Sequence, residues 1–366
     1  MALSARPIRN ARLSPSSDRT VKFGIIGTGR IAADFADDLK HAKNAALHAV
    51  LSREMHSATA FQRTHGAAKA YASLEAFMAD SGIDAVYVAS PNSAHYEQAL
   101  AAIRTRKAVL IEKPLAASVS EAEALSVEAA RHGTFAMEAM WIRFLPGIQR
   151  AKVLIESGAI GQVKSVRGEL SYFNAFDPGS RLFSKALGGG ASLDLGVYLL
   201  SLTTFLFGAP ESVSGQWKMA ASGVDCAARY ALGYQGFNAA LSTSLERDGH
   251  NVFEIEGEEG VLRIEDPFIQ ARRLRVLKGA AAKSRLLRPA SHIGPGRLQK
   301  LLARLPLPGQ QVLVFNYPGN GLQFEAEAVV QCVRAGEAGS RLAPLGESIA
   351  VLKMIESVLS QPASLA

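Results

Sequence analysis

The first 140 residues alternate short apolar runs with segments in which apolar residues recur every three or four positions. The runs are rich in Val and Ile and almost continuously apolar, as is typical of parallel strands buried on both faces. The segments between them predict crossover helices. The predicted strands are VKFGIIG (21–27), LHAVLS (47–52), DAVYVAS (84–90), AVLIEK (108–113) and TFAMEAM (134–140). The alternation predicts an α/β domain with a doubly wound parallel sheet over residues 21–142.

After about residue 160 the pattern becomes a series of closely spaced strand candidates with turn residues between them. They predict a largely antiparallel sheet with one face against helices, in a second α/β domain over residues 143–366. Helices are expected at about 191–206, 322–335 and 346–360. The strand candidates are 163–173, 211–220, 226–234, 237–246, 251–257, 260–266 and 273–279.

Charge changes this picture in one region. The net charge of the 366 residues is +7, and the stretch between Asp266 and Glu325 holds no acidic residue. We expect a basic surface insertion at about 279–318. Its only aromatic residues come late, from Phe315 onward, which argues against single-strand nucleic-acid binding. No apolar stretch of about 18 residues is free of charge, so we expect no membrane span.

The N-terminal sequence and the cysteine content bear on the cellular compartment of the protein. Residues 1–20 are basic, rich in Ser and Pro, and lack the apolar core of a secretory signal, so we expect a mobile arm. Cys226 and Cys332 are the only cysteines. Two cysteines make no disulfide framework and have no metal-ligand spacing, so we expect no metal site and a cytoplasmic protein.

A glycine-rich loop follows the first predicted strand and opens a helix. The pattern is G-x-G-x-x-A, in which the first glycine permits a tight turn and the second lets backbone approach a pyrophosphate at the helix N-terminus. A tight turn without ligand is the alternative, but strand and helix are both predicted where the motif needs them. The predicted cofactor-binding residues of this loop are Gly27, Thr28, Gly29, Arg30 and Ile31.

The end of the second strand bears on which dinucleotide binds. NAD enzymes place an acidic residue there for the ribose 2′-hydroxyl, whereas this strand ends in Ser52 and Arg53. A hydroxyl and a guanidinium suit a 2′-phosphate. We therefore expect NADP, with NAD possible because Glu54 follows and Arg53 could simply be solvated.

Polar residues also end the predicted strand at 108–113. Glu112, Lys113 and Pro114 follow a buried run, at the edge where doubly wound sheets bind ligand. A lysine among apolar neighbours there is expected to have a lowered pKa and to exchange a proton near neutrality. Asp194 and Tyr198 are four residues apart on a predicted helix, so they share one face.

Several of these stretches together resemble the Gfo/Idh/MocA oxidoreductase family. The resemblance rests on the glycine loop, SPNSAHYEQAL (90–100), VLIEKPLA (109–116) and GGGASLDLGVYLL (188–200). MEAMWIRFLP (137–146) and GNGLQFEAEAVVQCV (319–333) are similar to the branch of dimeric dihydrodiol dehydrogenase and NADP-dependent D-xylose dehydrogenase. The N-terminal arm and the basic segment depart from the family pattern.

The resemblance implies a Rossmann domain followed by a substrate-binding domain whose open sheet forms homodimers or homotetramers. It implies hydride transfer between nicotinamide C4 and a hydroxyl-bearing carbon of a sugar, cyclitol or dihydrodiol. Lys113 would contact the substrate hydroxyl and the nicotinamide ribose, and Tyr198 would be the general acid/base. Asp194 would hold a substrate hydroxyl or tune Lys113, whose charge would favour the phenolate of Tyr198.

Further residues are candidates on the same grounds, each with a plainer alternative. Glu112 would orient the cofactor or the lysine. Trp141 and Arg143 follow the fifth strand, where an aromatic wall and a hydroxyl donor would serve the substrate, although a packing tryptophan is an equal contender. The residues that follow the third strand and could border the nicotinamide are Ser90, Pro91, Asn92 and His95, of which His95 could equally be a surface histidine.

Two other functions remain open at this point. A nucleotide-sensing regulator would use the same fold without catalysis, but the combination of Lys113, Asp194 and Tyr198 argues against it. An enzyme similar to glucose–fructose oxidoreductase would retain its cofactor, with the N-terminal arm lying across the nucleotide.

Overall fold

The first sheet is parallel throughout. The computed structural model describes residues 19–283 and 308–365. The strand order of this six-stranded sheet is β3-β2-β1-β4-β5-β6, the order of a dinucleotide-binding doubly wound fold. The strands are β1 (Val21–Ile26), β2 (Ala45–Leu51), β3 (Lys69–Tyr71), β4 (Ala85–Val88), β5 (Ala108–Glu112) and β6 (Ala136–Ala139). All five predicted strands are confirmed, and the three-residue edge strand β3 was not predicted.

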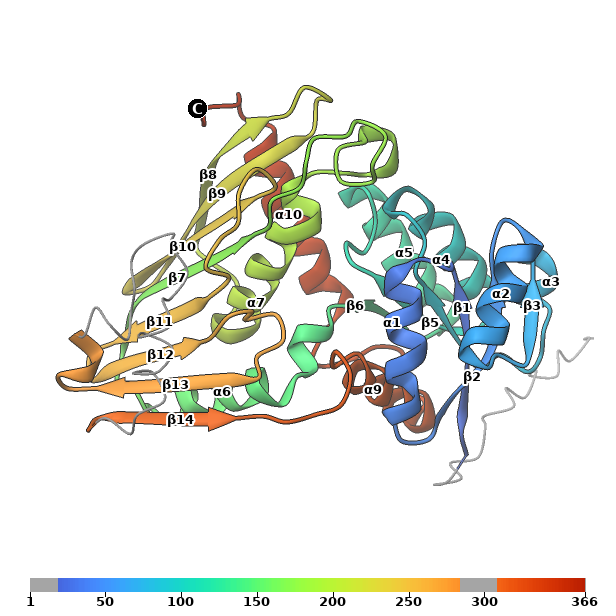
Figure 1. Ribbon diagram of the computed structural model, residues 1–366, viewed down its shortest axis with the longest axis horizontal. Helices are drawn as coiled ribbons and strands as arrows, with labels where there is room; N and C mark the ends of the chain where they lie inside the picture. The colour runs from blue at the N-terminus through green and yellow to red at the C-terminus, as the bar shows by residue number, and fades with distance from the viewer. Residues whose placement is uncertain (1–18, 284–307, 366) are drawn as a thin grey trace, which may run out of the picture.

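Burial explains why these runs form the centre of the sheet. Every residue of β4, β5 and β6 is buried, because helices cover both faces. Figure 1 shows the helices around this sheet. They are α1 (Arg30–Asp38), η1 (Leu39–His41), α2 (Met55–His65), α3 (Leu74–Met78), η2 (Asn92–Ala94), α4 (His95–Arg104), α5 (Val119–His132) and η3 (Trp141–Phe144).

The second sheet has eight strands in the order β14-β13-β12-β11-β7-β10-β9-β8. All neighbouring strands are antiparallel except β7 and β10, which are parallel. The mostly antiparallel sheet is confirmed. Its strands are β7 (Val163–Ser171), β8 (Ser212–Met219), β9 (Asp225–Tyr234), β10 (Phe237–Ser244), β11 (Phe253–Gly257), β12 (Gly260–Ile264), β13 (Arg273–Lys278) and β14 (Gln310–Val314).

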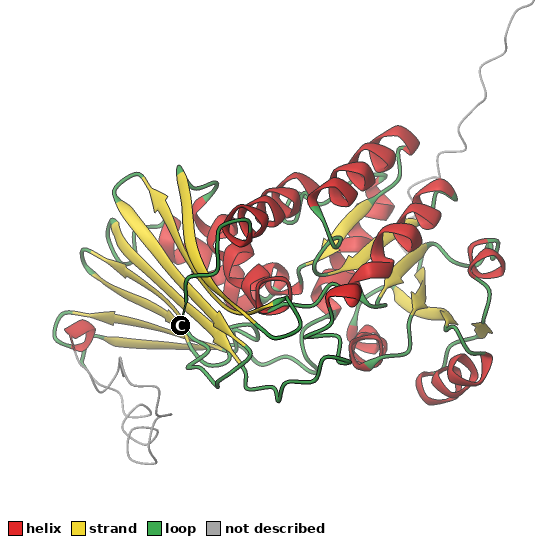
Figure 2. Cartoon of the chain, turned by 90° about the horizontal axis from the view of Figure 1, so that it is seen from above, coloured by secondary structure: helices red, strands yellow, loops and turns green. Residues whose placement is uncertain are grey.

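Four described helices of the second half lie on one face of this sheet (Figures 1 and 2). They are α6 (Pro146–Glu156), the π-helix η5 (Ser192–Gly196), α7 (Val197–Phe207) and α10 (Leu345–Leu359), with the short turns η4 (Lys185–Leu187) and η6 (Ala281–Lys283) in connecting segments. The stretch Lys185–Phe207 is long and apolar enough to cross a bilayer, but 83% of its most apolar window is buried inside the protein, as in a core helix.

The last two helices return to the first sheet. α9 (Gln323–Ala335) lies beside η1 and β2, and α10 runs from β8 to β6 and α5 (Figure 1). The carboxylate of Asp38, at the end of α1, accepts the backbone N–H groups of Gly321 (2.8 Å) and Leu322 (2.9 Å) just before α9. The predicted helices at 322–335 and 346–360 are therefore confirmed, and they join the two halves.

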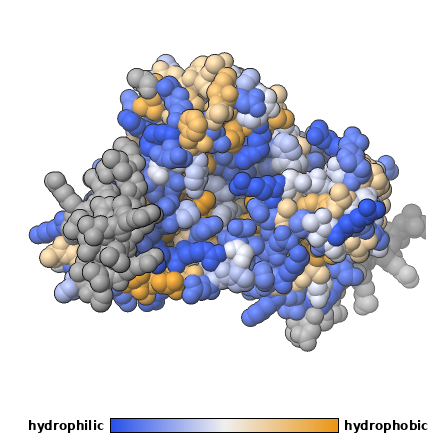
Figure 3. All heavy atoms as spheres, in the orientation of Figure 1, coloured by the Kyte–Doolittle hydropathy of each residue, from blue (hydrophilic) through white to orange (hydrophobic). Residues whose placement is uncertain are grey.

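The predicted basic insertion is in part regular structure. Residues 310–314 form β14, which pairs with β13 at the edge of the second sheet. Residues 284–307 of the insertion and residues 1–18 of the N-terminal arm lie outside the described residues. The face in Figure 3 is mostly hydrophilic and is hollowed between the two halves.

Candidate active site

Lys113 and Asp194 join the two halves of the molecule. Lys113 follows β5, at the carboxyl edge of the parallel sheet, and its peptide bond to Pro114 is cis. Its ammonium donates to the main-chain carbonyl of Asp194 (2.7 Å) and to the Oδ1 of the Asp194 carboxylate (3.0 Å). Both side chains are largely buried, with 12% and 14% of their surface exposed. The two residues are 81 positions apart in the sequence, so only the tertiary fold brings them together.

Tyr198 and Trp141 complete the group. The Lys113 ammonium lies 4.8 Å from the centroid of the Tyr198 ring. Trp141, on η3, donates its indole N–H to the Tyr198 hydroxyl (3.0 Å), and the two rings meet edge to face. The structure thus places Lys113, Asp194, Tyr198 and Trp141 together at the carboxyl edge of the first sheet.

The charge states differ from the sequence expectation. Burial acts to lower the pKa of Lys113, but Asp194, Tyr198 and Glu112 together outweigh burial and leave the pKa raised. Burial acts to raise the pKa of Asp194, and the cations Lys113 and Arg181 overcome it and hold the pKa at about 2. The prediction of a lysine with a lowered pKa was wrong, because an ion pair replaces an isolated ammonium.

The expectation for Tyr198 also needs correction. Burial raises its pKa to about 12, although Lys113 acts in the opposite direction. The Lys113 ammonium faces the ring and forms an ion pair with Asp194. The Asp194 charge partly cancels the effect of the ammonium on the pKa of Tyr198. Tyr198 is therefore a neutral phenol at physiological pH and a hydrogen-bond donor to whatever lies against it.

Arg181 belongs to this site and was not predicted. It lies in the segment between β7 and η4, and its guanidinium donates to the same Oδ1 of Asp194 that Lys113 contacts (2.9 Å). Its side chain is 61% exposed. An arginine in a connecting segment has no periodicity to mark it, so the sequence offered no signal beyond its closeness to the triple glycine at 188–190.

The Glu112 side chain is buried in the first half. Its carboxylate accepts the Tyr87 hydroxyl and, through the other oxygen, the backbone N–H of Lys113 (3.1 Å). Burial raises the pKa of Glu112 to about 7, although the Tyr87 hydrogen bond acts against it. Glu112 therefore holds the backbone that carries Lys113, and its charge changes near neutral pH.

The glycine loop has the geometry that a dinucleotide pyrophosphate needs. Gly27 has φ +111°, and a Cβ on it would lie 2.6 Å from the carbonyl oxygen of Ala89. A Cβ on Gly29, the N-cap of α1, would have no other atom within 4 Å, so the protein itself does not require a glycine there. Among the described residues no side chain caps α1. The loop therefore leaves an open helix N-terminus, which suits a phosphate.

The other loop residues are placed as follows. Ala32 is fully buried, as the motif expects, and Arg30 is almost fully exposed on the first turn of α1, as is typical of a loop that faces solvent or ligand. The hydroxyls of Thr28 and Ser52 lie 3.4 Å apart, which brings the end of β2 to the glycine loop. Arg53 is exposed just beyond. Ser52 and Arg53 thus lie at the end of β2, beside the glycine loop.

His95 has a structural position. It is fully buried, with Nδ1 2.9 Å from the Pro114 carbonyl oxygen and Nε2 3.0 Å from the Ser90 carbonyl oxygen. Burial lowers its pKa. The expectation that His95 faces the site was wrong, because its ring ties together the segments after β4 and β5. Asn92 donates to the Gly188 carbonyl (2.8 Å) and so also links the two halves.

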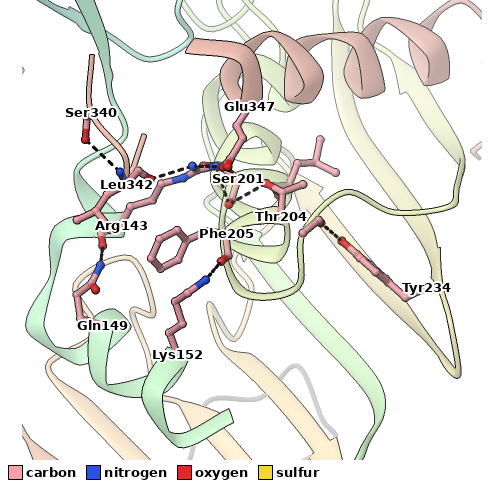
Figure 4. Close-up of polar contacts among 12 residues, drawn as sticks. Arg143, Gln149, Lys152, Ser201, Thr204, Phe205, Tyr234, Ser340, Leu342 and Glu347 are labelled. Atoms are coloured by element: carbon pink, nitrogen blue, oxygen red, sulfur yellow. Dashed lines mark hydrogen bonds and ion pairs between the residues drawn. The ribbon is translucent and has the colours of Figure 1, made fainter. Parts of the chain in front are cut away.

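Arg143 lies away from the group around Lys113. Figure 4 shows its guanidinium between α7 and the segment before α10. Nε donates to the Ser201 hydroxyl (2.8 Å), and Nη1 donates to the Leu342 carbonyl (3.1 Å) and to the carboxylate of Glu347. The expectation that Arg143 donates to substrate was wrong, because these contacts occupy a side chain that is 2% exposed.

Comparison with known proteins agrees with this fold and site. Residues 21–140 match the oxidoreductase family with an NAD-binding Rossmann fold, and residues 148–263 match the Gfo/Idh/MocA C-terminal domain. A trans-1,2-dihydrobenzene-1,2-diol dehydrogenase of Xenopus tropicalis is 31% identical over 345 residues, which cover 93% of this chain and 97% of that protein. The chain belongs to the Gfo/Idh/MocA family of NAD(P)-binding oxidoreductases.

Other relatives differ in what their names say they act on. The scyllo-inositol 2-dehydrogenase (NADP(+)) IolU of Bacillus subtilis is 36% identical over 251 residues, which cover 67% of this chain and 76% of that protein. A levoglucosan dehydrogenase in complex with NADH and levoglucosan has a TM-score of 0.78 at 20% identity, covering 93% of this chain and 97% of the other. An aldose–aldose oxidoreductase from Caulobacter crescentus has a TM-score of 0.77 at 21% identity, covering 93% and 96%. The last two show a shared fold.

Proposed function

We propose that the protein is an NADP-dependent dehydrogenase that acts on a hydroxyl-bearing carbon of a sugar, cyclitol or dihydrodiol. The observation that carries the proposal is the meeting of Lys113 with Asp194 and Tyr198 at the carboxyl edge of the first sheet, next to an open glycine loop. The substrate class is supported by the names of the relatives, which act on dihydrodiols and an inositol.

The roles of the chain's own residues follow from their charge states. A bound nicotinamide would supply or accept the hydride at C4. Tyr198, a neutral phenol, is set to donate its proton to the substrate oxygen when a carbonyl is reduced. The Lys113 ammonium stabilises negative charge on that oxygen. Oxidation is the reverse and needs the phenolate, so we propose that it becomes faster as pH rises.

NADP is favoured over NAD by the residues around the adenosine ribose. The glycine loop and the N-terminus of α1 would hold the pyrophosphate, with Ser52 and Arg53 at the 2′-phosphate. Ser52 and Arg53 stand directly after β2, where NAD enzymes place the acid that binds an unphosphorylated ribose. Ser90, Pro91, Asn92 and Glu112 would border the nicotinamide or support it from behind.

We also propose that homodimers or homotetramers form through the face of the second sheet that the described helices leave uncovered. Light scattering of the purified protein tests this proposal. A monomer at micromolar concentration would contradict it.

The activity is tested with a panel of aldoses, cyclitols and aromatic dihydrodiols, assayed with NADP⁺ and with NAD⁺ after desalting. We expect steady turnover of at least one substrate class with added NADP⁺. Binding of NADP without turnover of any substrate would instead favour a nucleotide-sensing regulator. Cofactor that stays bound through desalting and does not exchange would favour an enzyme that retains its cofactor.

A further inference from the structure

A buried carboxylate from the second sheet accepts hydrogen bonds at the start of the helix that carries Asp194 and Tyr198. Asp225, the first residue of β9, is 3% exposed. Its Oδ2 accepts the backbone N–H of Ser192 (2.7 Å) and the Ser192 hydroxyl (2.6 Å). Tyr230, on the same strand and 2% exposed, donates to the Ser192 Oγ (2.5 Å). No residue of this network touches Lys113 directly.

The hydrogen bonds of this network run from Tyr230 through Ser192 to Asp225. Because the Ser192 hydroxyl donates to the carboxylate, its oxygen is left to accept the Tyr230 hydroxyl. Burial raises the pKa of Tyr230, so the phenol keeps its proton. The chain of donors ends on Asp225, whose pKa burial raises while its two hydrogen bonds from Ser192 act in the opposite direction. The same carboxylate lies at the positive end of the helix that starts at Ser192.

The backbone is shaped to reach this carboxylate. Gly190 has φ +127°, and a Cβ there would collide with the Oδ1 of Asp225. Only a glycine therefore lets the chain pass so close to the carboxylate before Ser192. This assigns a role to the last glycine of the triple-glycine segment that needs no bound ligand.

The turn that starts on this network is a π-helix, Ser192–Gly196, and π-turns inside helices are frequent at functional sites. Asp194 follows two residues after Ser192, and both its carbonyl oxygen and its Oδ1 accept hydrogen bonds from the Lys113 ammonium. A displacement of Ser192 would therefore move both contacts at once.

We propose that Asp225, with Ser192 and Tyr230, is a positioning network that fixes Asp194 against Lys113 in the reaction assigned above, an inference that rests on the proposed function. A helix cap with no influence on the reaction is the alternative. The two are separable, because a cap affects stability alone, whereas a positioning network also affects the titration of Lys113.

The test is the Asp225→Ala variant, which removes the Oδ2 that accepts both Ser192 bonds. The Ser192 N–H and the Ser192 hydroxyl then both lose their acceptor, and the chain of donors is broken. A misplacement of about 1 Å costs on the order of 100-fold in rate, so we expect kcat to fall about 10- to 100-fold. NADP affinity should be unchanged, because the glycine loop lies in the other half.

The pH dependence of kcat distinguishes a positioning network from a helix cap. Asp194 raises the pKa of Lys113, so a displaced Asp194 should move the alkaline limb of the kcat profile to lower pH. Thr203→Val is the matched control, because it removes a buried hydroxyl from α7 that donates to the Leu199 carbonyl (2.7 Å) and leaves the helix start intact. The control should keep the wild-type profile and kcat within about twofold, as expected for a position that does not orient the reacting groups.

Tyr230→Phe serves as the second variant if Asp225→Ala does not fold, with a smaller fall in kcat and the same direction of pH shift expected. Inactive wild-type protein would reject the proposed function. Active wild-type protein with variants of unchanged kcat and pH profile would overturn the positioning network. A fall in kcat with an unchanged pH profile, equal to that of Thr203→Val, would also overturn it and leave Asp225 as a cap.

Discussion

Replacing Tyr198 by phenylalanine removes a single oxygen from the centre of the site. The ring remains, and with it the edge-to-face contact with Trp141 at 6.4 Å and the Lys113 ammonium at 4.8 Å. The indole N–H of Trp141 loses its acceptor. An unpaired buried donor costs about 1–3 kcal/mol of unfolding free energy. The variant should therefore fold, with a modest loss of stability.

The effect on turnover should be larger and separable from this loss. A positioned acid or base contributes about 10²–10⁴-fold, which corresponds to about 3–5 kcal/mol of activation free energy. We expect kcat to fall by that factor in the direction of carbonyl reduction, where Tyr198 donates its proton. NADP affinity should barely change, because the glycine loop makes no contact with Tyr198.

The assay is steady-state kinetics in both directions across pH, with denaturant unfolding of each variant. Tyr234→Phe is the matched control, because its hydroxyl donates to the Gly208 carbonyl (3.1 Å) at the far end of α7. The control should lose little activity. Near-normal turnover of Tyr198→Phe at every pH would refute the assignment, and Lys113 would become the candidate proton carrier.

Three further predictions concern cofactor choice, pH and stability. Arg53→Asp should weaken NADP binding by about 1.5–3 kcal/mol, as for a hydrogen bond to a charged group, and calorimetry with both cofactors measures this. Burial raises the pKa of Glu112 to about 7 from its usual 4.5, so this group's contribution to stability is present below pH 4.5 and is lost as pH rises to about 7. The unfolding free energy of wild type relative to Glu112→Gln should therefore fall across that range in denaturant titrations. Asp38→Ala removes the acceptor of the Gly321 and Leu322 N–H groups and should cost on the order of 3 kcal/mol of unfolding free energy, with bonds to charged groups contributing about 1.5–3 each.

Each of these has a clear contrary result. Equal affinity of the wild-type protein for NADP and NAD would show that Arg53 does not select the cofactor. Parallel pH curves for wild type and Glu112→Gln would show that Glu112 does not titrate in this range. An unfolding midpoint of Asp38→Ala equal to that of wild type would show that the bonds before α9 are dispensable.

The fold was largely predictable because buried strands and helices have characteristic hydrophobic patterns in the local sequence. Strands buried on both faces read as continuous apolar runs, which is why β4 and β5 were found. β3 has three residues and β14 reads QQVLV amid glycine and proline, so neither differs enough from a loop. Such edge strands are defined by their partner strand, and a local pattern does not contain the partner.

Lys113, Asp194 and Tyr198, which the sequence predicts as site residues, lie together in the structure, whereas the pKa directions of Lys113 and Tyr198 differ from the prediction. Lys113 and Asp194 each follow a recognisable local pattern, yet their ion pair depends on the fold. The pKa direction of Lys113 was misjudged because it depends on charged neighbours that only the fold brings together, and that of Tyr198 because it depends on how deeply the fold buries the phenol. Arg143 shows the same limit, since a tertiary hydrogen-bond network, and no local motif, decides where its guanidinium goes.

The return of α9 and α10 to the first sheet has a consequence for how the protein is made. During synthesis the strands β1 to β6 leave the ribosome first. The contacts of β6 with α10, and the hydrogen bonds of the Asp38 carboxylate to the N–H groups before α9, form only after those later segments have emerged. The nascent N-terminal half therefore exposes apolar surface, and leaves the Asp38 carboxylate without these partners, until nearly the whole chain has emerged; such exposed surface promotes aggregation. A ribosome stalled before residue 319 would hold all six strands of the first sheet but neither α9 nor α10 to cover them.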